Sequence, residues 1–549
     1  MAKFDPSTKI WSSKTVQYLY PMDTYLGEVI LKTCSETPER VIQIHHEKDE
    51  QLTCKELKES SINIAVNLMK LDIKADDIIG VICQNSNFLT CLLTGSVIMG
   101  AVIHPLDHSL STDNISELYA QSKPKMIICD PGMLTTLNEA LEKVNLKPLI
   151  LITSDDPDDS EISAFKLLRT VSVDYDSYVA PKFDKPADQK LLAILCSSGI
   201  TGLQKNVCVS HATCLRFDFK TYPKPPSKPL TFSSAYWSSG FFLHMFASFY
   251  QNDVRIWSSD DFNIYKLIEI VEKRKISGIN LAPSSLASIL QSKQFLSSNH
   301  ESLKTFVVLG SFLSGSLRNK FCETLSNKTL MVGYGLTEVF VCLTKPDEVY
   351  NGSTVGSMIT PNLRIKVVNE DGQGVDPGER GEIRVKLQFN FPGYYNDPEA
   401  TANAIDSEGF LKTGDIGYFD EDGCLYIVDR IRESFKYKNY TVFPSEIENV
   451  IQSIDGVELV CVFPVFNENF GTDLATAAVK KSSNDVKLTE SDIIEAVAEK
   501  LPEIKHIHGG VYFMDSMPLT PSGKVQTKLV KGIVMQKLKK IQENGGNSV

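Results

Sequence analysis

The sequence predicts an α/β fold in which a large N-terminal domain is followed by a smaller α+β domain. Up to about residue 360, apolar strands alternate with helices, a pattern typical of parallel sheets covered by helices on both faces. Beyond that point the strands become short, and Gly- and Asp-rich turns separate them. We therefore expect doubly wound sheets first, then a small β-barrel-like region, and last a compact α+β unit.

The doubly wound sheets are predicted from two series of strands and helices. Their strands are runs of aliphatic residues, and their helices carry apolar residues three and four positions apart. The first series comprises strands at 78–82, 125–129 and 149–152 with helices at 88–99 and 133–144, and the second comprises strands at 253–257, 278–281 and 306–309 with a helix at 265–275.

Shorter signals predict the barrel-like region and the last domain. The barrel-like region has alternating strands at 364–368 and 382–386 and a hairpin that turns at 420–423. The last domain has a helix opening at Ser445, which has the capping-box spacing to Glu448. Its other elements are strands at 459–464, 475–479 and 510–514 and a helix at 491–500. We set the two domains at 1–430 and 431–549.

Composition narrows the class of protein. Of the 549 residues, 42% are hydrophobic and 23% charged, which excludes a disordered, collagenous or coiled-coil chain. The net charge of −12 argues against nucleic acid as a partner, because phosphate binding needs a concentrated basic face. The longest apolar stretch, residues 88–104, is interrupted by polar residues and is too short to span a bilayer, so no integral membrane association is expected.

The cysteines and histidines do not suggest a metal site. The cysteines form no Cys-x-x-Cys pair, which favours free thiols in a reducing compartment. His45 and His46 are adjacent, and His506 and His508 are two apart, without carboxylate partners to complete a ligand set. The first residues lack an apolar signal core, so a cytoplasmic location is expected.

A polar loop at 196–205 lies between apolar strands at 191–195 and 207–209. Its glycines let the backbone approach a ligand, its hydroxyls donate hydrogen bonds and its lysine adds charge, as a polyphosphate requires. A polar hairpin turn accounts for the same residues equally well, and the order is not that of a Walker loop. The candidate phosphate ligands are Ser197, Ser198, Gly199, Thr201, Gly202 and Lys205.

A second candidate segment follows the apolar pair at 331–332. Tyr334, between Gly333 and Gly335, offers an aromatic face for a nucleotide base, and Thr337 and Glu338 follow where they can reach phosphate and Mg²⁺. The alternative for this segment alone is a strand end with a surface glutamate.

Two more segments contribute charged groups. Asp415 lies in a loop and suits the hydroxyls of a ribose, while Arg430, beyond the hairpin, suits phosphate or ribose oxygens. Lys524 lies on a turn shaped by Pro and Gly and is a mobile point charge. Each of these residues alone also fits an ordinary solvated surface.

Together, the order and spacing of these segments resemble the adenylate-forming superfamily of acyl-CoA synthetases, 4-coumarate–CoA ligases, beetle luciferases and adenylation domains of peptide synthetases. The motifs that carry the resemblance are YGLTE at 334–338, TGD at 413–415, IVDR at 427–430 and KYK at 436–438. The resemblance covers nearly the whole chain and is closest to insect luciferase-like fatty acyl-CoA ligases and 4-coumarate–CoA ligases.

The resemblance implies an AMP-forming carboxylate–CoA ligase that acts on a medium- or long-chain fatty acid or an aryl acid. The carboxylate would attack the α-phosphate of ATP to give acyl-AMP and pyrophosphate. The C-terminal domain, a mobile lid, would then rotate so that CoA displaces AMP. ATP, Mg²⁺ and CoA are the implied cofactors, and the carboxylic acid and CoA are the implied partners.

The resemblance also implies roles for the nucleotide residues. The ligands in the loop 197–205 would bind the leaving pyrophosphate, Tyr334 would stack on adenine and Thr337 would contact the α-phosphate. Glu338 would hold Mg²⁺, and Asp415 would take the ribose hydroxyls with Arg430 beside it.

Further roles follow from the same resemblance. Lys524 would be the catalytic cation of adenylation, where negative charge concentrates at the α-phosphate. Arg432 would be the hinge between the two domain orientations. The carboxylic acid would contact Arg216, Phe241, Gly310 and Ser311.

Several residues depart from the family pattern. Ile200 replaces a hydroxyl residue of the phosphate loop, Gln204 replaces a Pro, and Asn206 replaces a Gly. Asn439 stands where a Gly approaches the pantetheine channel, so its side chain would crowd CoA. These changes leave open a catalytically degenerate homologue that binds a nucleotide or an acyl group.

A luciferase-like monooxygenase is the remaining alternative. Ser239 stands where luciferases carry a His, and residues 546–549 are not the Ser-Lys-Leu peroxisomal signal. Both features favour the ligase, and a peroxisomal location remains only by analogy with the family.

Overall fold

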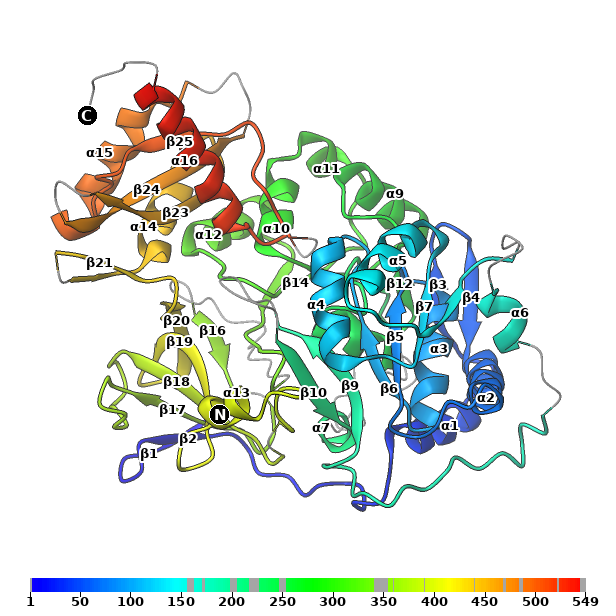
Figure 1. The fold of residues 1–549 in the computed structure, drawn as a ribbon. Helices are drawn as coiled ribbons and strands as arrows, with labels where there is room; N and C mark the ends of the chain where they lie inside the picture. Colours follow the sequence, from blue (N-terminus) through cyan, green and yellow to red (C-terminus); the bar gives the residue numbers. More distant parts are fainter. Residues whose placement is uncertain are drawn as a thin grey trace.

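The computed structural model describes most of the chain. The described residues are 2–155, 162–169, 173–197, 205–216, 227–245, 253–339, 354–358, 360–389, 391–438, 440–467, 471–482, 487–520 and 523–543. The elements after residue 430 form a lobe at the upper left of Figure 1, drawn in gold, orange and red.

The first sheet has the strand order β10-β9-β6-β5-β7-β8 and is parallel except for β10, which runs antiparallel to β9. Its continuous aliphatic strands are buried on both faces, as expected for a parallel sheet. The strands are β5 (Ile78–Ile82), β6 (Val102–Pro105), β7 (Met126–Cys129), β8 (Leu149–Ile152), β9 (Leu191–Cys196) and β10 (Asn206–Ser210).

The second sheet has the order β15-β14-β13-β11-β12-β3-β4 and is parallel except for β4. Its N-terminal strands β3 and β4 come from a part of the chain for which the sequence predicts no strand. The strands are β3 (Val41–His45), β4 (Glu50–Thr53), β11 (Pro229–Thr231), β12 (Arg255–Trp257), β13 (Gly278–Leu281), β14 (Thr305–Val308) and β15 (Thr329–Val332).

Helices cover both sheets in layers, which confirms the doubly wound prediction. One core cluster joins α1–α3 to the facing sides of the two sheets, α4 and α5 pack on the outer face of the first sheet, and α9–α12 pack on that of the second. The helices are α1 (Leu26–Glu36), α2 (Cys54–Lys70), α3 (Asn87–Ile98), α4 (Thr112–Ser122), α5 (Leu134–Lys143), α9 (Ile264–Arg274), α10 (Pro283–Gln291), α11 (Lys293–Ser297) and α12 (Gly315–Thr324). The predicted elements of both series begin and end within two residues of these bounds.

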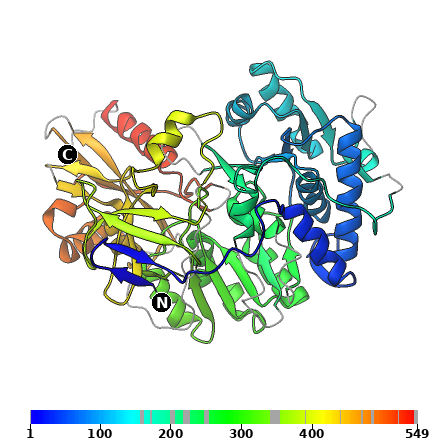
Figure 2. The same cartoon turned by 90° about the horizontal axis from the view of Figure 1, so that it is seen from below.

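The β-barrel-like region, called the half-barrel below, is an antiparallel sheet of order β1-β2-β17-β18-β19-β20-β16. The predicted hairpin is confirmed, since Phe419 pairs with Leu425 across the turn. The first strands of the chain complete the sheet beside β17, as Figure 2 shows in blue against yellow-green. The strands are β1 (Lys3–Asp5), β2 (Ile10–Ser12), β16 (Thr354–Ser357), β17 (Arg364–Val368), β18 (Gly381–Lys386), β19 (Leu411–Phe419) and β20 (Cys424–Arg430).

The last domain is α+β. Strands β23, β24 and β25 form a sheet with α14 and α15 against one core cluster and α16 against another. The elements are β21 (Phe435–Tyr437), β22 (Tyr440–Val442), α14 (Pro444–Gln452), β23 (Val457–Asn467), β24 (Thr472–Lys481), α15 (Glu490–Lys500), β25 (Val511–Phe513) and α16 (Thr527–Glu543).

The predicted capping box at Ser445 is wrong. Helix α14 begins at Pro444, after Phe443, because proline has no N–H to satisfy and a backbone angle suited to the first helical position. Ser445 therefore lies in the first turn, where its hydroxyl donates to the Val428 carbonyl (2.6 Å) and its N–H donates to the Asp429 carboxylate (3.0 Å). These bonds tie the start of α14 to the end of β20.

The remaining short elements connect the layers. They are α6 (Ala164–Arg169), α7 (His211–Leu215), α8 (Ser238–Met245), α13 (Pro398–Ala404) and the 3₁₀ turns η1 (Pro131–Met133) and η2 (Glu503–Lys505). Among the described residues, the helices all fall short of the length and apolarity that a bilayer crossing requires.

Candidate active site

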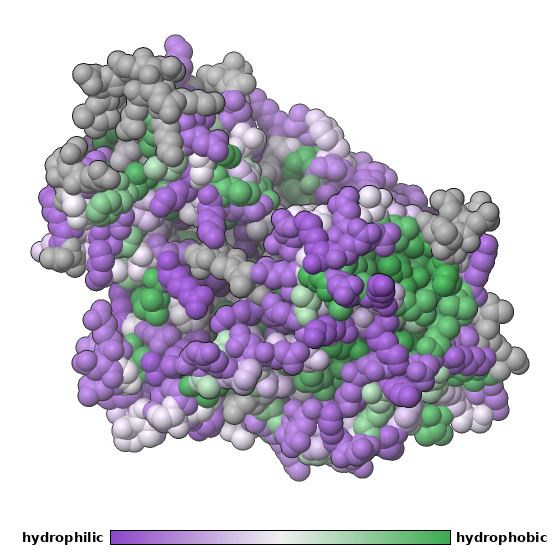
Figure 3. Space-filling model, viewed as in Figure 1, coloured by the Kyte–Doolittle hydropathy of each residue, from purple (hydrophilic) through white to green (hydrophobic). Residues whose placement is uncertain are grey.

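A cavity of about 2490 Å³ lies between the large N-terminal part and the C-terminal lobe. The surface around the cleft between these two parts is largely hydrophilic (Figure 3). Glycines and a tyrosine that follow β14 and β15 line the cavity at the carboxyl ends of adjacent parallel strands, which is where α/β sheets bind ligands. Gly310 follows β14, and Gly333, Tyr334 and Gly335 follow β15.

Tyr334, Asp415 and Arg430 form one hydrogen-bonded group. The Tyr334 hydroxyl donates to Asp415 Oδ2 at 2.6 Å, and Arg430 Nε donates to Asp415 Oδ1 at 3.1 Å. Asp415 and Arg430 are paired across the β19–β20 ladder, which places the two side chains together. Burial raises the pKa of Asp415, while Arg430 and Tyr334 favour its charged form. Both oxygens of a buried carboxylate are thus fixed beside the cavity.

Thr337 and Glu338 lie in the turn after Tyr334 and line the cavity. The Tyr394 hydroxyl donates to Glu338 Oε1 at 3.0 Å. The Lys205 ammonium lies over the Tyr394 ring, 4.3 Å from the ring centroid. Burial and the Glu338 carboxylate raise the pKa of Tyr394, so its hydroxyl stays a donor. The sequence analysis did not select Tyr394, since its only signal is a Gly-Tyr-Tyr turn.

Lys524 reaches the cavity from the C-terminal lobe. Its turn is closed by bonds between Thr520 and Lys524 in both directions, and Ser284 of α10 donates to the Gly523 carbonyl. A Cβ on Gly310 would lie 3.7 Å from Lys524 Cε, so the lysine passes directly over that glycine.

Burial is the main cause that lowers the pKa of Lys524, to about 8, and Arg430 lowers it further. Glu433 and Asp415 oppose the shift. The lysine is therefore mostly protonated at pH 7, with a pKa only about one unit higher. The carboxylates of Glu433 and Asp415 favour this charged form.

The phosphate loop is described only at its ends. Ser197 donates its N–H to the Lys205 carbonyl at 2.9 Å and accepts from the Lys205 N–H at its hydroxyl, and both residues line the cavity. Ser198, Gly199, Thr201 and Gly202, with the departures Ile200 and Gln204, lie outside the described residues, as does Asn439. Asn206 is buried and donates to Gln121.

The four residues expected to contact the carboxylic acid lie in different environments. Gly310 lines the cavity, with φ +92°, and Ser311 beside it is exposed. Phe241 is fully buried in the core cluster of α1–α3, and Arg216 is buried and donates to the Val339 carbonyl. Burial lowers the pKa of Arg216 to about 10.

Other residues of α8, and Trp237 just before it, face the cavity instead of Phe241. Ser239 accepts or donates one bond with Ser233 at 3.0 Å, and Trp237 and Phe242 supply aromatic surface. Opposite them, one face of the second sheet supplies small and medium side chains: Thr231, Asn280, Thr305 and Val307. The cavity therefore extends along the sheet as a channel, with aromatic rings on the helix side and hydroxyl, amide and small apolar side chains on the sheet side.

Arg432 lies in the exposed turn between β20 and β21 and lines the cavity. It is close enough to Tyr394 for its charge to oppose the rise in the pKa of that residue. The chain thus passes from the half-barrel to the C-terminal lobe beside the site.

Glu338 can supply one ligand to a divalent cation whose other ligands are substrate phosphates and water. In the described part of the chain, groups of three or more His, Cys, Asp or Glu able to hold a metal ion are absent. Mg²⁺ keeps several waters and is commonly held by one or two carboxylates plus substrate phosphates, so one glutamate beside a phosphate loop fits that chemistry.

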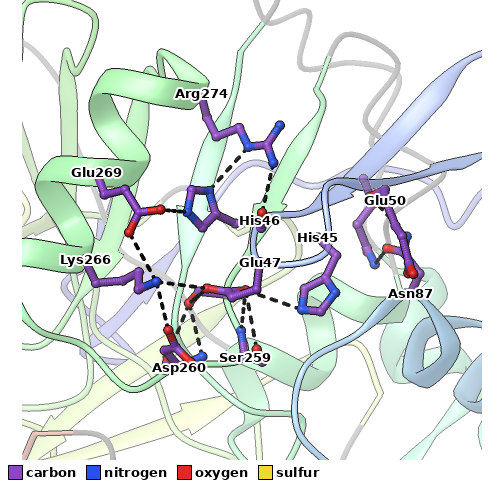
Figure 4. A network of polar contacts seen from close by, with 12 residues as sticks. His45, His46, Glu47, Glu50, Asn87, Ser259, Asp260, Lys266, Glu269 and Arg274 are labelled. Carbon is purple, nitrogen blue, oxygen red and sulfur yellow. Dashed lines mark hydrogen bonds and ion pairs between the residues drawn. The ribbon is translucent and has the colours of Figure 1, made fainter.

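The adjacent histidines have carboxylate neighbours that the sequence analysis missed. His46 Nε2 lies 2.9 Å from Glu269 and its Nδ1 accepts from Arg274 at 3.3 Å, while His45 Nε2 lies 3.4 Å from Glu47 (Figure 4). Lys266 joins the same network through Asp260 at 3.0 Å and Glu269 at 3.2 Å. The cluster ties β3 to α9.

Known proteins are similar to this chain over almost its whole length. The model of the AMP-binding enzyme family matches residues 30–395, and that of the AMP-binding enzyme C-terminal domain matches residues 446–524. Probable 4-coumarate–CoA ligase 3 of Dictyostelium discoideum is 27% identical over 92% of this chain and 94% of its own. The 4-coumarate–CoA ligase CCL1 of Humulus lupulus is 28% identical over 95% of this chain and 96% of its own.

Two solved structures share the fold. ATP-bound MatB from Rhodopseudomonas palustris has a TM-score of 0.81 at 22% identity and covers 93% of this chain and 99% of its own. The luciferase-like enzyme from the nonluminescent Zophobas morio mealworm has a TM-score of 0.67 at 26% identity and covers 76% of this chain and 98% of its own.

Proposed function

Because the chain belongs to the AMP-binding enzyme family, we propose that it is an ATP-dependent, AMP-forming acyl-CoA ligase for a fatty or aryl carboxylic acid. One observation carries the proposal: Lys524 from the C-terminal lobe enters the same cavity as Tyr334 and Glu338 of the large N-terminal part. A cation, a base-stacking ring and a carboxylate in one cleft match the needs of a nucleotide whose α-phosphate is attacked.

In the first half-reaction a carboxylate oxygen of the acid attacks the α-phosphorus of ATP. The new P–O bond forms as the bond to the β-phosphate oxygen breaks, and pyrophosphate leaves. Lys524 stabilises the charge that gathers on the α-phosphate, with Thr337 as a hydroxyl donor. Tyr334 stacks on adenine, and Asp415, held by Arg430, accepts from the ribose hydroxyls.

The pyrophosphate end of the site is the loop from Ser197 to Lys205. The ligands Ser197, Ser198, Gly199, Thr201, Gly202 and Lys205 would bind the β- and γ-phosphates, and Glu338 would hold Mg²⁺. When bound, the cation neutralises phosphate charge. Glu338 contributes one carboxylate, and Tyr394 leaves its Oε2 free of that hydrogen bond.

In the second half-reaction the thiolate of CoA attacks the carbonyl carbon of acyl-AMP, and AMP leaves with the electron pair. We assign 1–430 to the nucleotide domain and 431–549 to a lid that turns about Arg432 between the steps. The position of Arg432 in the exposed turn between β20 and β21 supports this assignment.

The residues that line the channel suggest the chemical class of the carboxylic acid. Trp237 and Phe242 face Thr305 and Val307 across it, which suits a hydrocarbon chain or an aryl ring. Gly310 lies where the channel meets Lys524, so the carboxylate of the acid would point at the lysine. The Dictyostelium discoideum and Humulus lupulus relatives are both named for 4-coumarate, an aryl acid.

Exchange of labelled pyrophosphate into ATP tests the proposal. Medium- and long-chain fatty acids, 4-coumarate and other aryl acids are supplied singly with Mg²⁺, and the thioester is then followed after CoA is added. At least one acid is expected to support both signals. Nucleotide binding without exchange for any acid would identify a degenerate homologue instead, and light with luciferin and ATP would identify a luciferase-like monooxygenase.

A further inference from the structure

The segment after β18 makes an isolated antiparallel bridge, between Tyr394 and Val207 of β10, just beyond the phosphate loop. Cys208 donates its N–H to the Gly393 carbonyl at 2.9 Å, and Tyr395 donates its N–H to the Asn206 carbonyl at 2.7 Å. The backbone of Tyr394 is therefore fixed alongside β10, and its N–H is also bonded to Thr401 Oγ1 at 2.9 Å. A side chain on such a backbone has little freedom to move.

The Tyr394 side chain contacts two charged residues of opposite sign. Its hydroxyl donates to Glu338 Oε1 at 3.0 Å, and its ring lies 4.3 Å below the Lys205 ammonium. Neither contact depends on the residues between Ser197 and Lys205. Tyr394 also lines the cavity, as Glu338 and Lys205 do.

We propose that Tyr394 is a positioning residue that sets the Glu338 carboxylate for a divalent cation and the Lys205 ammonium for the departing pyrophosphate. The proposal rests on the function above and adds a residue to it. The hydroxyl acts on Glu338, because a ligating carboxylate whose other oxygen is hydrogen-bonded keeps one orientation. The ring acts on Lys205 through a cation–π contact.

The two halves of the side chain can be removed in turn. Tyr394→Phe loses only the hydroxyl and keeps the ring under Lys205, whereas Tyr394→Leu loses both. Tyr395→Phe is the matched control, since it removes the hydroxyl of the next residue, which packs on the cluster of Ile78 and Val102 instead of on charged groups.

The test measures Mn²⁺ binding by electron paramagnetic resonance in the presence of a non-hydrolysable ATP analogue, without any acid. Tyr394→Phe is expected to weaken Mn²⁺ binding by about 10- to 100-fold, as loss of a partner of a metal ligand does. Tyr395→Phe is expected to bind as the wild type does.

The second measurement is competition between pyrophosphate and the analogue without metal. Tyr394→Phe is expected to leave pyrophosphate binding unchanged, whereas Tyr394→Leu should weaken it by about 2- to 5-fold through loss of the cation–π contact. Mn²⁺ binding by Tyr394→Phe equal to that of the wild type, or no Mn²⁺ binding by the wild type, would overturn the inference.

Failure of the proposed ligase function gives a different result. If the wild type binds Mn²⁺ with the analogue but exchanges pyrophosphate with no acid, the ligase is rejected while the role of Tyr394 stands. If the wild type exchanges pyrophosphate and Tyr394→Phe keeps full Mn²⁺ affinity, the ligase stands and the role of Tyr394 is rejected.

Discussion

At the scale of single residues, Lys524 is the group on which the proposed first step depends most. It lies over Gly310 with its pKa lowered to about 8, mainly by burial. Lys524→Ala is expected to slow acyl-AMP formation by about 100- to 1000-fold and to spare thioester formation from preformed acyl-AMP. Single-turnover measurements of the two steps check this, and an equal loss in both would contradict the assignment.

The same lysine predicts a pH dependence. Since the charged form stabilises the α-phosphate, kcat/KM for adenylation should fall by about tenfold per pH unit above about 8. The sign follows from the lowered pKa: the ammonium is present below that value and lost above it. Lys524→Arg should move the alkaline limb upward, because a guanidinium stays protonated. If the pH profile of Lys524→Arg falls at the same pH as that of the wild type, the titrating group is not Lys524.

Motifs selected residues that the structure brings to one cavity, and their roles toward a nucleotide remain proposals. Tyr334, Thr337, Glu338 and Lys524 all line the cavity. Phe241 could not be separated from Phe242 in the same way. Helix α8 is apolar on all sides there, so periodicity did not show which ring faces the core, and the packing of α1–α3 decides it.

At the scale of elements, the turn that carries Lys524 is held on α10. Gly523 has φ +79°, and a Cβ there would lie 2.6 Å from Ser284 Oγ. Gly523→Ala is therefore expected to lift the turn and slow adenylation by about 5- to 30-fold, the equivalent of 1–2 kcal/mol for a left-handed side chain. The half-reactions measured in parallel check this, with thioester formation from acyl-AMP expected to persist.

Gly532→Ala is the control for that substitution. Gly532 lies within α16, where a Cβ would meet no heavy atom of the described residues within 4 Å. The substitution Gly532→Ala should leave the rate of adenylation unchanged and stabilise the helix by up to about 1 kcal/mol. Equal effects of the two substitutions on adenylation would show that the close approach to Ser284 does not matter.

Elements with a strong local pattern were predicted well, and those set by distant partners were not. The strands β5, β8 and β17 begin and end where the sequence places them, because β5 and β8 are short aliphatic runs and β17 alternates polar and apolar residues. In contrast, β1 and β2 are only three residues long and depend on pairing with β17. At α14 the local preference of Pro444 for the first helical position outweighed the capping signal of Ser445.

At the scale of the whole molecule, the described bonds between the lobes include those of Ser445 and Arg380 beside the Ser284–Gly523 contact. Ser445 of α14 bonds to Val428 and Asp429 of β20, and Arg380 of the half-barrel lies 3.2 Å from Glu446. The Arg380 pair is half exposed and contributes little, whereas the Ser445 bonds are buried. Reorientation of a lid must break contacts of this kind.

Ser445→Ala is expected to shift the balance between the two steps. Loss of the 2.6 Å bond to the Val428 carbonyl should favour opening, so that adenylation slows by about 2- to 10-fold while thioester formation is unchanged or faster. The ratio of the two half-reaction rates checks this, and Ser453→Ala, in a bond to Val450 within the same helix, is the control. A lower rate in both steps would indicate damage to the fold instead.

The domain order and the doubly wound sheets were predictable from the alternation of strands and helices. The division at Arg430 remains a proposal, because the turn at 431–434 has no composition of its own to mark a linker. Assembly of the cavity from both ends of the chain was predictable only through the resemblance to known enzymes. It depends on Gly523 meeting Ser284, a contact between residues 239 positions apart.

The pairing of the first strands with the half-barrel sets an order of events during synthesis. Trp11 packs on Phe419 with ring centroids 4.6 Å apart, and β2 pairs with β17, so the start of the chain must wait for residues made roughly 350 positions later. At about 5–20 residues per second this delay is on the order of 20 to 70 s. Throughout that time the Trp11 indole and the edge of β2 lack their partners, and the first sheet, whose last strand β10 ends at Ser210, can form before those partners are made.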